Sequence, residues 1–476
     1  MFPLAIGWIR SVLHSAVEGA PECKIDTICT DSRTAAAGSL FFALQGERTD
    51  GHDYVRDVLA KGACAVVRLG VMPSELLSAY AGQIIEVESP IRAMGALAAA
   101  YRRTHLRHIH IVGVTGSVGK TSTREMIAAI LKSSHIRVAA SQKNYNNEIG
   151  VPLTLFQIPL DTEIAVVEMG MRAEGEIRDL ADIALPDTAV ITGIGYAHIE
   201  ILGSQEAIAR AKSEIFELLP EGGTAVYSED IPYRALVESH IPADSRVVIT
   251  GNNTGVLWAE PIASNPLEAS SFYLCRKQGN ERVTVTIPAA GSHHMKNAEI
   301  AAGGCIALGA TLADCANALS TWHGADGRMA LKTASNGACV LDDCYNASPE
   351  SMWAAIRTLS NSAIRDNGRR IAVIGDMREL GDYGNNLHVQ LGELIAASPI
   401  DELITIGNLA AITAKSAESA SSGRLQPICT GNWQECASIL PALVLPTDTV
   451  LIKGSRALEL EHVVAALTGE ECSTHG

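Results

Sequence analysis

The stretch that decides the fold runs from residue 109 to residue 121 and reads Ile-His-Ile-Val-Gly-Val-Thr-Gly-Ser-Val-Gly-Lys-Thr. Its first half is apolar and rich in β-branched residues, which is typical of a buried strand. Glycines then interrupt the pattern, and a helical periodicity follows from Ser122 to Lys132. A strand, a glycine-rich turn and a helix in this order open a nucleotide-binding α/β unit.

The turn predicts a site for the phosphates of ATP, because its backbone N–H groups and the following helix N-terminus attract phosphate oxygens. The residues expected to form it are Thr115, Gly116, Ser117, Val118, Gly119, Lys120 and Thr121. Lys120 would reach the β- and γ-phosphates, and the Thr121 hydroxyl would bind Mg²⁺. The general pattern has a glycine where this chain has Val114, so the pattern is incomplete. The strand–turn–helix setting nevertheless favours ATP binding over a chance glycine turn.

Similar patterns on both sides of this unit predict an α/β protein of three domains. A helical run from Ile91 to Tyr101, with the basic connector Arg102–His105, closes the first domain. Boundaries near 107 and 325 give domains 1–107, 108–325 and 326–476. Apolar and polar residues alternate from about 255 to 290, which predicts antiparallel strands. Other strands are expected within 164–170, 189–195, 338–343, 370–376, 402–407 and 449–455. Their polar or glycine ends predict the place of the site, because ligands bind at the carboxyl ends of parallel strands.

Three residues outside the turn are candidates for the same chemistry. Glu168 ends a strand and could hold Mg²⁺, because hard divalent cations prefer oxygen ligands. A solvated acid or a helix cap explains Glu168 equally well. His198 follows the strand at 189–195, and Lys212 lies in a helical stretch. From the sequence alone, a packed or capping histidine and a solvated lysine remain the simpler interpretations.

Composition and charge exclude several classes of function. The net charge of −16 repels nucleic acid and anionic membranes, so neither is an expected partner. The 11 cysteines include no CxxC pair, which argues against a zinc site or a disulfide scaffold. The chain lacks a long apolar run and a basic signal-peptide region, so we expect a cytoplasmic protein without a membrane span.

Several motifs occur together in the order of a known family. In the central region they are Thr115–Thr121, Asn144–Thr154, Glu168–Gly170, Ala197-His198 and Ala211–Glu214. In the last third they are Leu341–Met352, Val373–Gly381 and Ile452–Arg456. In the first domain they are Asp31–Thr34, Gly38–Arg48 and Asp50–Tyr54. Nearly the whole chain thus resembles the Mur ligases, the ATP-dependent amide-forming enzymes that build the peptide stem of bacterial peptidoglycan. It is most similar to the branch that adds D-alanyl-D-alanine to UDP-N-acetylmuramoyl-tripeptide.

This resemblance implies a role for each domain: UDP-sugar binding in the small first domain, ATP binding in the central P-loop domain, and dipeptide binding in a Rossmann-like third domain. Lys212 matches a lysine that is carbamylated in the family, and with Glu168 and His198 it is expected to hold a second Mg²⁺. The expected nucleotide contacts are Asn297, Arg328 and Asp343. The expected substrate contacts are Ser32, Arg33, Gly46 and Asp50 at the UDP end, Asn146 and catalytic Asn147 at the reacting groups, and Tyr345, Asn346, Ser348 and Lys453 on the dipeptide side.

The chain departs from the family pattern at three positions. His294 replaces the first asparagine of the adenine-side motif Gly-x-His-Asn-x-x-Asn, which reads Gly291-Ser-His-His-Met-Lys-Asn297 here. Adenine contacts and nucleotide preference are therefore open. Gly193 stands where an asparagine is common, and Ser348 replaces a frequent asparagine of the dipeptide motif.

The implied reaction joins the tripeptide carboxylate to the dipeptide amine through an acyl phosphate, in a protein expected to be a monomer. Close alternatives are a ligase that adds a diamino acid and a folylpolyglutamate synthetase. The first usually carries an Asp-Asn-Pro-Arg motif, which this sequence lacks, and the second lacks the Asp-Ser-Arg type of first domain. A P-loop switch or regulatory module is an alternative of another class, but it would not need Glu168, His198 and Lys212 beside a third domain.

Overall fold

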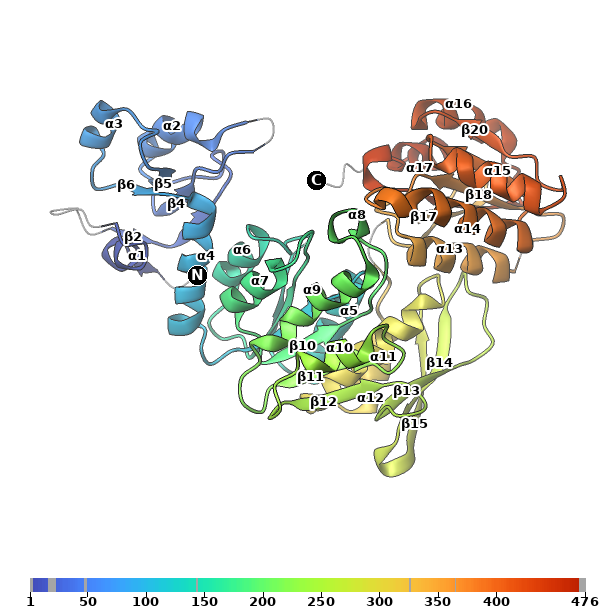
Figure 1. Ribbon diagram of the computed structural model, residues 1–476, viewed down its shortest axis with the longest axis horizontal. Coiled ribbons are helices and arrows are strands. Elements are labelled where there is room, and N and C mark those ends of the chain that lie inside the picture. The colour runs from blue at the N-terminus through green and yellow to red at the C-terminus, as the bar shows by residue number, and fades with distance from the viewer. Residues whose placement is uncertain are drawn as a thin grey trace.

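The computed structural model describes residues 3–15, 23–46, 49–142, 144–324, 327–363 and 365–470. In Figure 1 the chain forms three lobes in sequence order, from the blue N-terminal lobe through the green and yellow central lobe to the orange and red C-terminal lobe. Each lobe contains a largely parallel sheet with helices, which confirms the predicted α/β class. The expected boundary near 325 falls on residues 325 and 326, outside the described residues.

The first lobe holds a parallel sheet of order β3-β4-β5-β6 and a small antiparallel pair, β1 with β2. The strands are β1 Leu4–Ala5, β2 Lys24–Ile25, β3 Thr27–Cys29, β4 Ser39–Phe42, β5 Cys64–Arg68 and β6 Ile84–Val87. The helices are α1 Ile6–Val12, η1 Gly51–Tyr54, α2 Val55–Ala60, α3 Ser74–Ala79 and α4 Pro90–His105. The expected connector Arg102–His105 is wrong, because these residues form the last turn of α4. Buried Arg102 bonds the carbonyl oxygens of Ala184 and Leu185 in the central lobe.

The central sheet has the order β15-β14-β13-β12-β11-β10-β7-β9-β8. Its strands are β7 His110–Thr115, β8 Val138–Ala140, β9 Ile164–Glu168, β10 Thr188–Ile191, β11 Thr224–Ser228, β12 Arg246–Thr250, β13 Leu257–Pro261, β14 Ser270–Arg276 and β15 Glu281–Ile287. Neighbours from β8 to β13 are parallel, while β13, β14 and β15 pair antiparallel, as predicted for 255–290. Val114 pairs with both Glu168 and Val190, so the carboxyl ends of β7, β9 and β10 meet at one edge.

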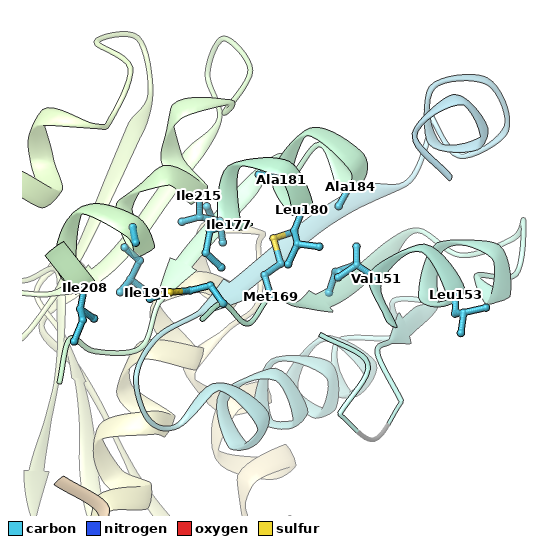
Figure 2. Close-up of a cluster of buried hydrophobic side chains, with 14 of the residues drawn as sticks. Val151, Leu153, Met169, Ile177, Leu180, Ala181, Ala184, Ile191, Ile208 and Ile215 are labelled. Carbon is cyan, nitrogen blue, oxygen red and sulfur yellow. The ribbon is translucent and has the colours of Figure 1, made fainter. Parts of the chain in front are cut away.

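Alternate residues of the central strands pack on opposite faces of the sheet, as the two-residue period of a strand requires. On β7, Ile111 joins one core cluster, whereas Val112 and Val114 join the other. Figure 2 shows part of the first cluster, with side chains of α6 Gly150–Gln157, α7 Glu176–Ala184 and α9 Gln205–Glu217 gathered against the sheet. The second cluster lies under α5 Lys120–Ser133, α11 His293–Ala307 and α12 Leu312–Leu319. Each fully buried Ile or Leu contributes about 1.5–3 kcal/mol relative to an exposed one. The smaller helices of this lobe are α8 Ile199–Leu202, α10 Arg234–Ser239 and η2 Gln278–Asn280.

The third lobe holds a sheet of order β16-β17-β21-β18-β19-β20, parallel except for β16 against β17. Its strands are β16 Ala330–Thr333, β17 Cys339–Asp343, β18 Arg370–Gly375, β19 Glu402–Ile406, β20 Ile428–Thr430 and β21 Thr449–Lys453. Its helices are α13 Pro349–Asn361, η3 Gly381–Tyr383, α14 Gly384–Ala397, α15 Ala410–Ala420, α16 Trp433–Leu443, η4 Arg456–Leu458 and α17 Glu461–Thr468. Asp343 and Lys453 are register partners at the carboxyl end of this sheet. In the described part of the chain, no helix has the length and apolar character that crossing a membrane requires.

Candidate active site

The predicted phosphate turn lies between β7 and α5. Gly119 caps the helix with φ 82°, a left-handed conformation that glycine adopts without penalty. A Cβ atom at this position would lie 2.4 Å from Asn297 Oδ1, on α11. Glycine is therefore required for two reasons, and the second places the predicted nucleotide residue Asn297 directly against the turn.

Lys120 begins α5 and donates from Nζ to the carbonyl oxygen of Gly116, at 2.8 Å. Burial lowers the pKa of Lys120; the charge of Glu168 opposes this shift, and the charge of Arg328 adds to it. Two cations, one from the central lobe and one from the third, thus face the same space. Such a pair is suited to a polyanion, which would stabilise the charged form of both.

Glu168 ends β9 and is 2% exposed. Its Oε2 lies 3.2 Å from Arg124 Nη1, and its Oε1 accepts a hydrogen bond from Asn146 Nδ2 at 2.9 Å. The Asn146 carbonyl oxygen accepts the N–H of Gly170, and Asn147 Oδ1 accepts the N–H of Gly150 at 2.9 Å. These bonds fix both predicted asparagines at the edge of the sheet, and the amide N–H₂ of Asn147 is left as the group that can contact a ligand.

His198 and Lys212 lie on the other side of the turn. His198 has φ 67° and is the N-cap residue of α8, and its Nδ1 lies 2.7 Å from Glu379 Oε2 of the third lobe. Burial lowers the pKa of His198, the charge of Glu379 opposes this, and Lys212 and Lys120 add to it. Lys212 lies on α9 and is 1% exposed. Its pKa lies well below the ordinary value, because burial and then the positive charge of Lys120 disfavour its charged form.

The third lobe contributes Asp343 and Lys453, whose Oδ2 and Nζ atoms lie 2.7 Å apart. Lys453 Nζ also donates to the carbonyl oxygen of Asn346, at 2.9 Å. Burial raises the pKa of Asp343, and Lys453 opposes the shift. The guanidinium of Arg328 stacks on the Tyr345 ring, with its carbon 4.3 Å from the ring centroid. Arg328 is thereby held at the mouth of the nucleotide site.

A cavity of about 610 Å³ joins these groups across the two lobes. Of the predicted residues, it is lined by Ser117, Val118, Gly119, Lys120, Thr121, Asn146, Asn147, Glu168, His198, Asn297, Arg328, Asp343, Tyr345, Asn346, Ser348 and Lys453. Lys212 lies behind this surface, where it acts on Lys120 and His198 through charge. His294 is buried beside the Trp322 ring, and the two ring centroids are 4.9 Å apart. His294, which stands where the family has asparagine, is therefore a buried residue that packs against Trp322.

The four residues predicted to bind the UDP end lie in the first lobe and do not line this cavity. Ser32 and Arg33 follow β3, while Gly46 and Asp50 follow β4, so all four come after the carboxyl ends of neighbouring strands. Arg33 bonds Asp31 and lowers the pKa of that carboxyl to about 2. Asp50 caps η1 through the N–H of His52. The two groups of substrate residues thus occupy separate lobes.

The structure adds residues that the sequence reasoning did not single out. Glu350, Glu379 and Arg378 line the same cavity, and Arg124 pairs with Glu168. Ser348 has a second task, because its hydroxyl caps α13 by accepting the N–H of Ser351 at 3.4 Å. Serine and asparagine are about equally favourable N-caps, so the departure from asparagine keeps the cap of α13. A Pro-Glu pair at a helix start was the available signal for Glu350, but it also fits an ordinary first helical turn.

Comparisons with known proteins agree with this geometry. The sequence matches the Mur ligase family, catalytic domain, at residues 24–102; the Mur ligase middle domain at 114–305; and the Mur ligase, glutamate ligase domain, at 327–456. The UDP-N-acetylmuramoyl-tripeptide--D-alanyl-D-alanine ligase of Bacillus subtilis strain 168 is 35% identical over 446 residues, which cover 93% of each chain. The chain belongs to the Mur ligase family.

Two solved Mur ligases resemble the whole chain. The MurF structure I from Acinetobacter baumannii has a TM-score of 0.87 at 30% identity and covers 98% of this chain and 99% of its own. The MurF ligase from Thermotoga maritima, crystallised with ADP, has a TM-score of 0.77 at 28% identity and covers 92% and 96%. The similarity includes all three lobes, which contradicts the alternative of a regulatory ATP-binding module.

Proposed function

We propose that this Mur ligase adds D-alanyl-D-alanine to UDP-N-acetylmuramoyl-tripeptide at the expense of ATP. One observation carries the proposal: the phosphate turn, Glu168 and His198 of the central lobe share a cavity with Asp343 and Lys453 of the third lobe. Full-length similarity to ligases named for this reaction supports the choice of substrates.

The reaction has two steps. An oxygen of the tripeptide carboxylate attacks the γ-phosphorus of ATP, the bond from that phosphorus to the bridging oxygen breaks, and ADP leaves with the electron pair. The dipeptide amine then attacks the carbonyl carbon of the acyl phosphate, the bond from that carbon to the phosphate oxygen breaks, and phosphate leaves. Lys120 and the N–H groups of the turn stabilise the negative charge on the phosphates, and no covalent bond to the protein is needed.

Other residues orient the reactants. Asn147 and Asn146 position the carboxylate beside the γ-phosphate, while Asn297, Arg328 and Asp343 hold the nucleotide from α11 and the third lobe. The lobes meet around the reacting groups, which excludes water from an acyl phosphate that water would hydrolyse. The ion pair of Asp343 with Lys453 keeps both charges in place until substrate arrives.

The donor set fits Mg²⁺. Among the described residues, no group of three His, Cys, Asp or Glu side chains is close enough to form an all-protein metal site. Mg²⁺ does not require one, because it keeps several waters and binds through one or two carboxylates together with substrate phosphates. Thr121 would help to hold one ion, and Glu168, His198 and a carbamylated Lys212 would help to hold a second. When bound, these ions offset the charge of the phosphates and of the incoming carboxylate.

The surroundings of Lys212 support the carbamylation that the family resemblance implies. A lysine amine reacts with CO₂ only in its neutral form, and burial beside Lys120 favours that form. The product would be an anionic oxygen ligand in place of a second buried cation. It would also pair with the charge of Lys120 instead of opposing it.

We assign residues 1–107 to UDP-sugar binding, 108–325 to ATP binding and 326–476 to dipeptide binding. Ser32, Arg33, Gly46 and Asp50 would hold the UDP end, and Tyr345, Asn346, Ser348 and Lys453 the dipeptide side. The substrates are small soluble molecules, so the enzyme would work in the cytoplasm, and we expect it to work as a monomer.

The test is phosphate release from ATP with each substrate omitted in turn. We expect release only when UDP-N-acetylmuramoyl-tripeptide and D-alanyl-D-alanine are both present. Equal release without either substrate would refute the ligase assignment.

A further inference from the structure

Glu350 lies in the first turn of α13, directly after Pro349 and the cap residue Ser348. It lines the cavity on the wall that also carries Asn346 and Ser348, where we place the incoming dipeptide. The roles proposed above for the turn, the metal ligands and the nucleotide contacts leave this carboxylate without a task.

The side chain crosses from the third lobe to the central lobe. Glu350 Oε1 accepts a hydrogen bond from the N–H of Tyr196 at 2.8 Å. A Cβ atom on Gly195 would lie 2.3 Å from the same oxygen, so only glycine admits this approach. The N–H of Gly195 in turn donates to Ser117 Oγ, in the phosphate turn, at 2.8 Å. Glu350 is therefore held at a fixed place. The residue next to its partner Tyr196, Gly195, contacts the phosphate turn directly.

The second oxygen of Glu350 is in a different situation. Oε2 is buried, and among the described residues it has no hydrogen-bond partner. No ion pair links Glu350 to any Lys, Arg or His side chain that the structure describes. Burial raises the pKa of Glu350, and hydrogen bonds from backbone N–H groups, including that of Tyr196, together with the nearby Ser348 side chain, oppose the shift. A buried carboxylate oxygen without a donor is costly, so it calls for a donor that arrives with a ligand.

The dipeptide is the substrate that brings such a donor. Its α-amine has an ordinary pKa of about 8 and therefore arrives mostly as an ammonium ion. The other charged groups at this end of the cavity include Lys453, Arg328 and Arg378, which would repel an ammonium and attract phosphates. Of the third-lobe carboxylates that line the cavity, Asp343 pairs with Lys453 and Glu379 with His198, whereas Glu350 has no ion-pair partner among the described residues. Its raised pKa makes it accept protons more readily than an exposed carboxylate.

We propose that Glu350 binds the ammonium group of D-alanyl-D-alanine through Oε2 and takes the proton that the amine must lose before it attacks the acyl phosphate. This inference rests on the proposed function and adds the residue that activates the amine. One N–H bond of the ammonium breaks as an O–H bond forms on Oε2, and the freed electron pair forms the C–N bond. The C–O bond to phosphate breaks, phosphate leaves with its electron pair, and the nitrogen releases its second proton to the departing phosphate.

The substitution Glu350→Gln separates this role from a purely structural one. The amide oxygen of glutamine can still accept the N–H of Tyr196, so the contact between the lobes is kept while the charge and the basicity are lost. We expect kcat/KM for D-alanyl-D-alanine to fall on the order of 100-fold or more, with a higher KM for the dipeptide as well as a lower kcat. Glu350→Asp, which restores a carboxylate, should recover part of the activity. Glu393→Gln, on the exposed face of α14, is the matched control.

Hydroxylamine supplies the decisive readout, because it is uncharged at neutral pH and traps acyl phosphates as hydroxamates without help from a base. With ATP and UDP-N-acetylmuramoyl-tripeptide, the Glu350→Gln enzyme should form hydroxamate at close to the wild-type rate. Such turnover would also prove that the variant is folded and makes the intermediate. Equal loss of hydroxamate and of dipeptide product would overturn the inference in favour of a contact that merely joins the lobes. Unchanged activity towards the dipeptide would overturn it as well. A wild-type enzyme that forms neither product would refute the proposed function itself, and this inference with it.

Discussion

Glu379 Oε2 of the third lobe lies 2.7 Å from His198 Nδ1 of the central lobe. Two further contacts accompany this one: the N–H of Glu200 donates to the Glu379 carbonyl oxygen at 3.3 Å, and the Tyr383 hydroxyl donates to the Gly203 carbonyl oxygen at 3.2 Å. The third lobe therefore rests on the segment 198–203, and the carboxylate of Glu379 orients the imidazole that we assign to metal binding.

Glu379→Ala should lower kcat on the order of 10- to 100-fold, since residues that orient a metal ligand typically carry an effect of this size. Glu379→Gln keeps an oxygen for Nδ1 and should lose less. Steady-state phosphate release with both substrates measures the effect, with exposed Glu418→Ala as the control. Wild-type turnover in Glu379→Ala would show that His198 needs no such partner.

Lys212→Ala should abolish activity, because it removes both the amine and the carbamate that we propose on it. Excess bicarbonate or a short carboxylic acid should restore part of the rate by placing an anion in the vacated space. The measurement is product formation with and without the added anion. Full activity of the unrescued variant would contradict the carbamate.

Gly119→Ala should raise KM for ATP at least 10-fold. The new Cβ would lie 2.4 Å from Asn297 Oδ1, and φ 82° costs an alanine on the order of 1–2 kcal/mol. Gly222→Ala is the matched control, because Gly222 has φ 72° and nothing within 4 Å of the added atom. Equal KM values in the two variants would mean that backbone strain, and not the crowding of the phosphate turn, sets the effect.

Acidification from pH 6.5 towards 4 should destabilise the ligand-free enzyme through His293. Burial lowers the pKa of His293 to about 4, and the charges of Lys453 and Arg328 add to the shift. The unfolded chain, with an ordinary pKa of about 6.5, binds a proton in this range that the folded chain does not, so stability falls as pH falls.

The substitution His293→Gln should therefore flatten the pH dependence of the urea midpoint between pH 6.5 and 4. The change in slope corresponds to at most one proton fewer taken up on unfolding. An unaltered slope in His293→Gln would indicate that His293 titrates in the folded protein as it does in the unfolded chain.

Local patterns in the sequence were sufficient for the centre of the fold. The strand–turn–helix at 109–132 is confirmed as β7 and α5, although α5 begins at Lys120 because Gly119 is its cap. The strand ends at Glu168 and Asp343 were also predicted, since each closes an apolar run long enough to recognise. The last strand was expected to run to Ser455 but ends at Lys453. The three-residue strands β8 and β20 were missed, because so few residues show no period, and the strands β11 and β12 were not predicted either.

Contacts between lobes were not predictable in this way. Glu350 and Glu379 gain their meaning from Tyr196 and His198, which lie more than a hundred residues away in the sequence. An acidic residue in a first helical turn or a loop is ordinary by itself. Lys212 was singled out only through the family resemblance, and its burial, which makes the carbamate chemically reasonable, became visible only in the fold.

Mass analysis of the product shows whether the enzyme joins the dipeptide to the tripeptide. The wild-type enzyme is incubated with ATP, D-alanyl-D-alanine and UDP-N-acetylmuramoyl-tripeptides that carry either diaminopimelate or lysine. We expect, for at least one of them, a UDP-muramoyl pentapeptide whose mass equals the sum of the two substrates minus one water, formed together with ADP and phosphate. ATP hydrolysis without that product would contradict this expectation.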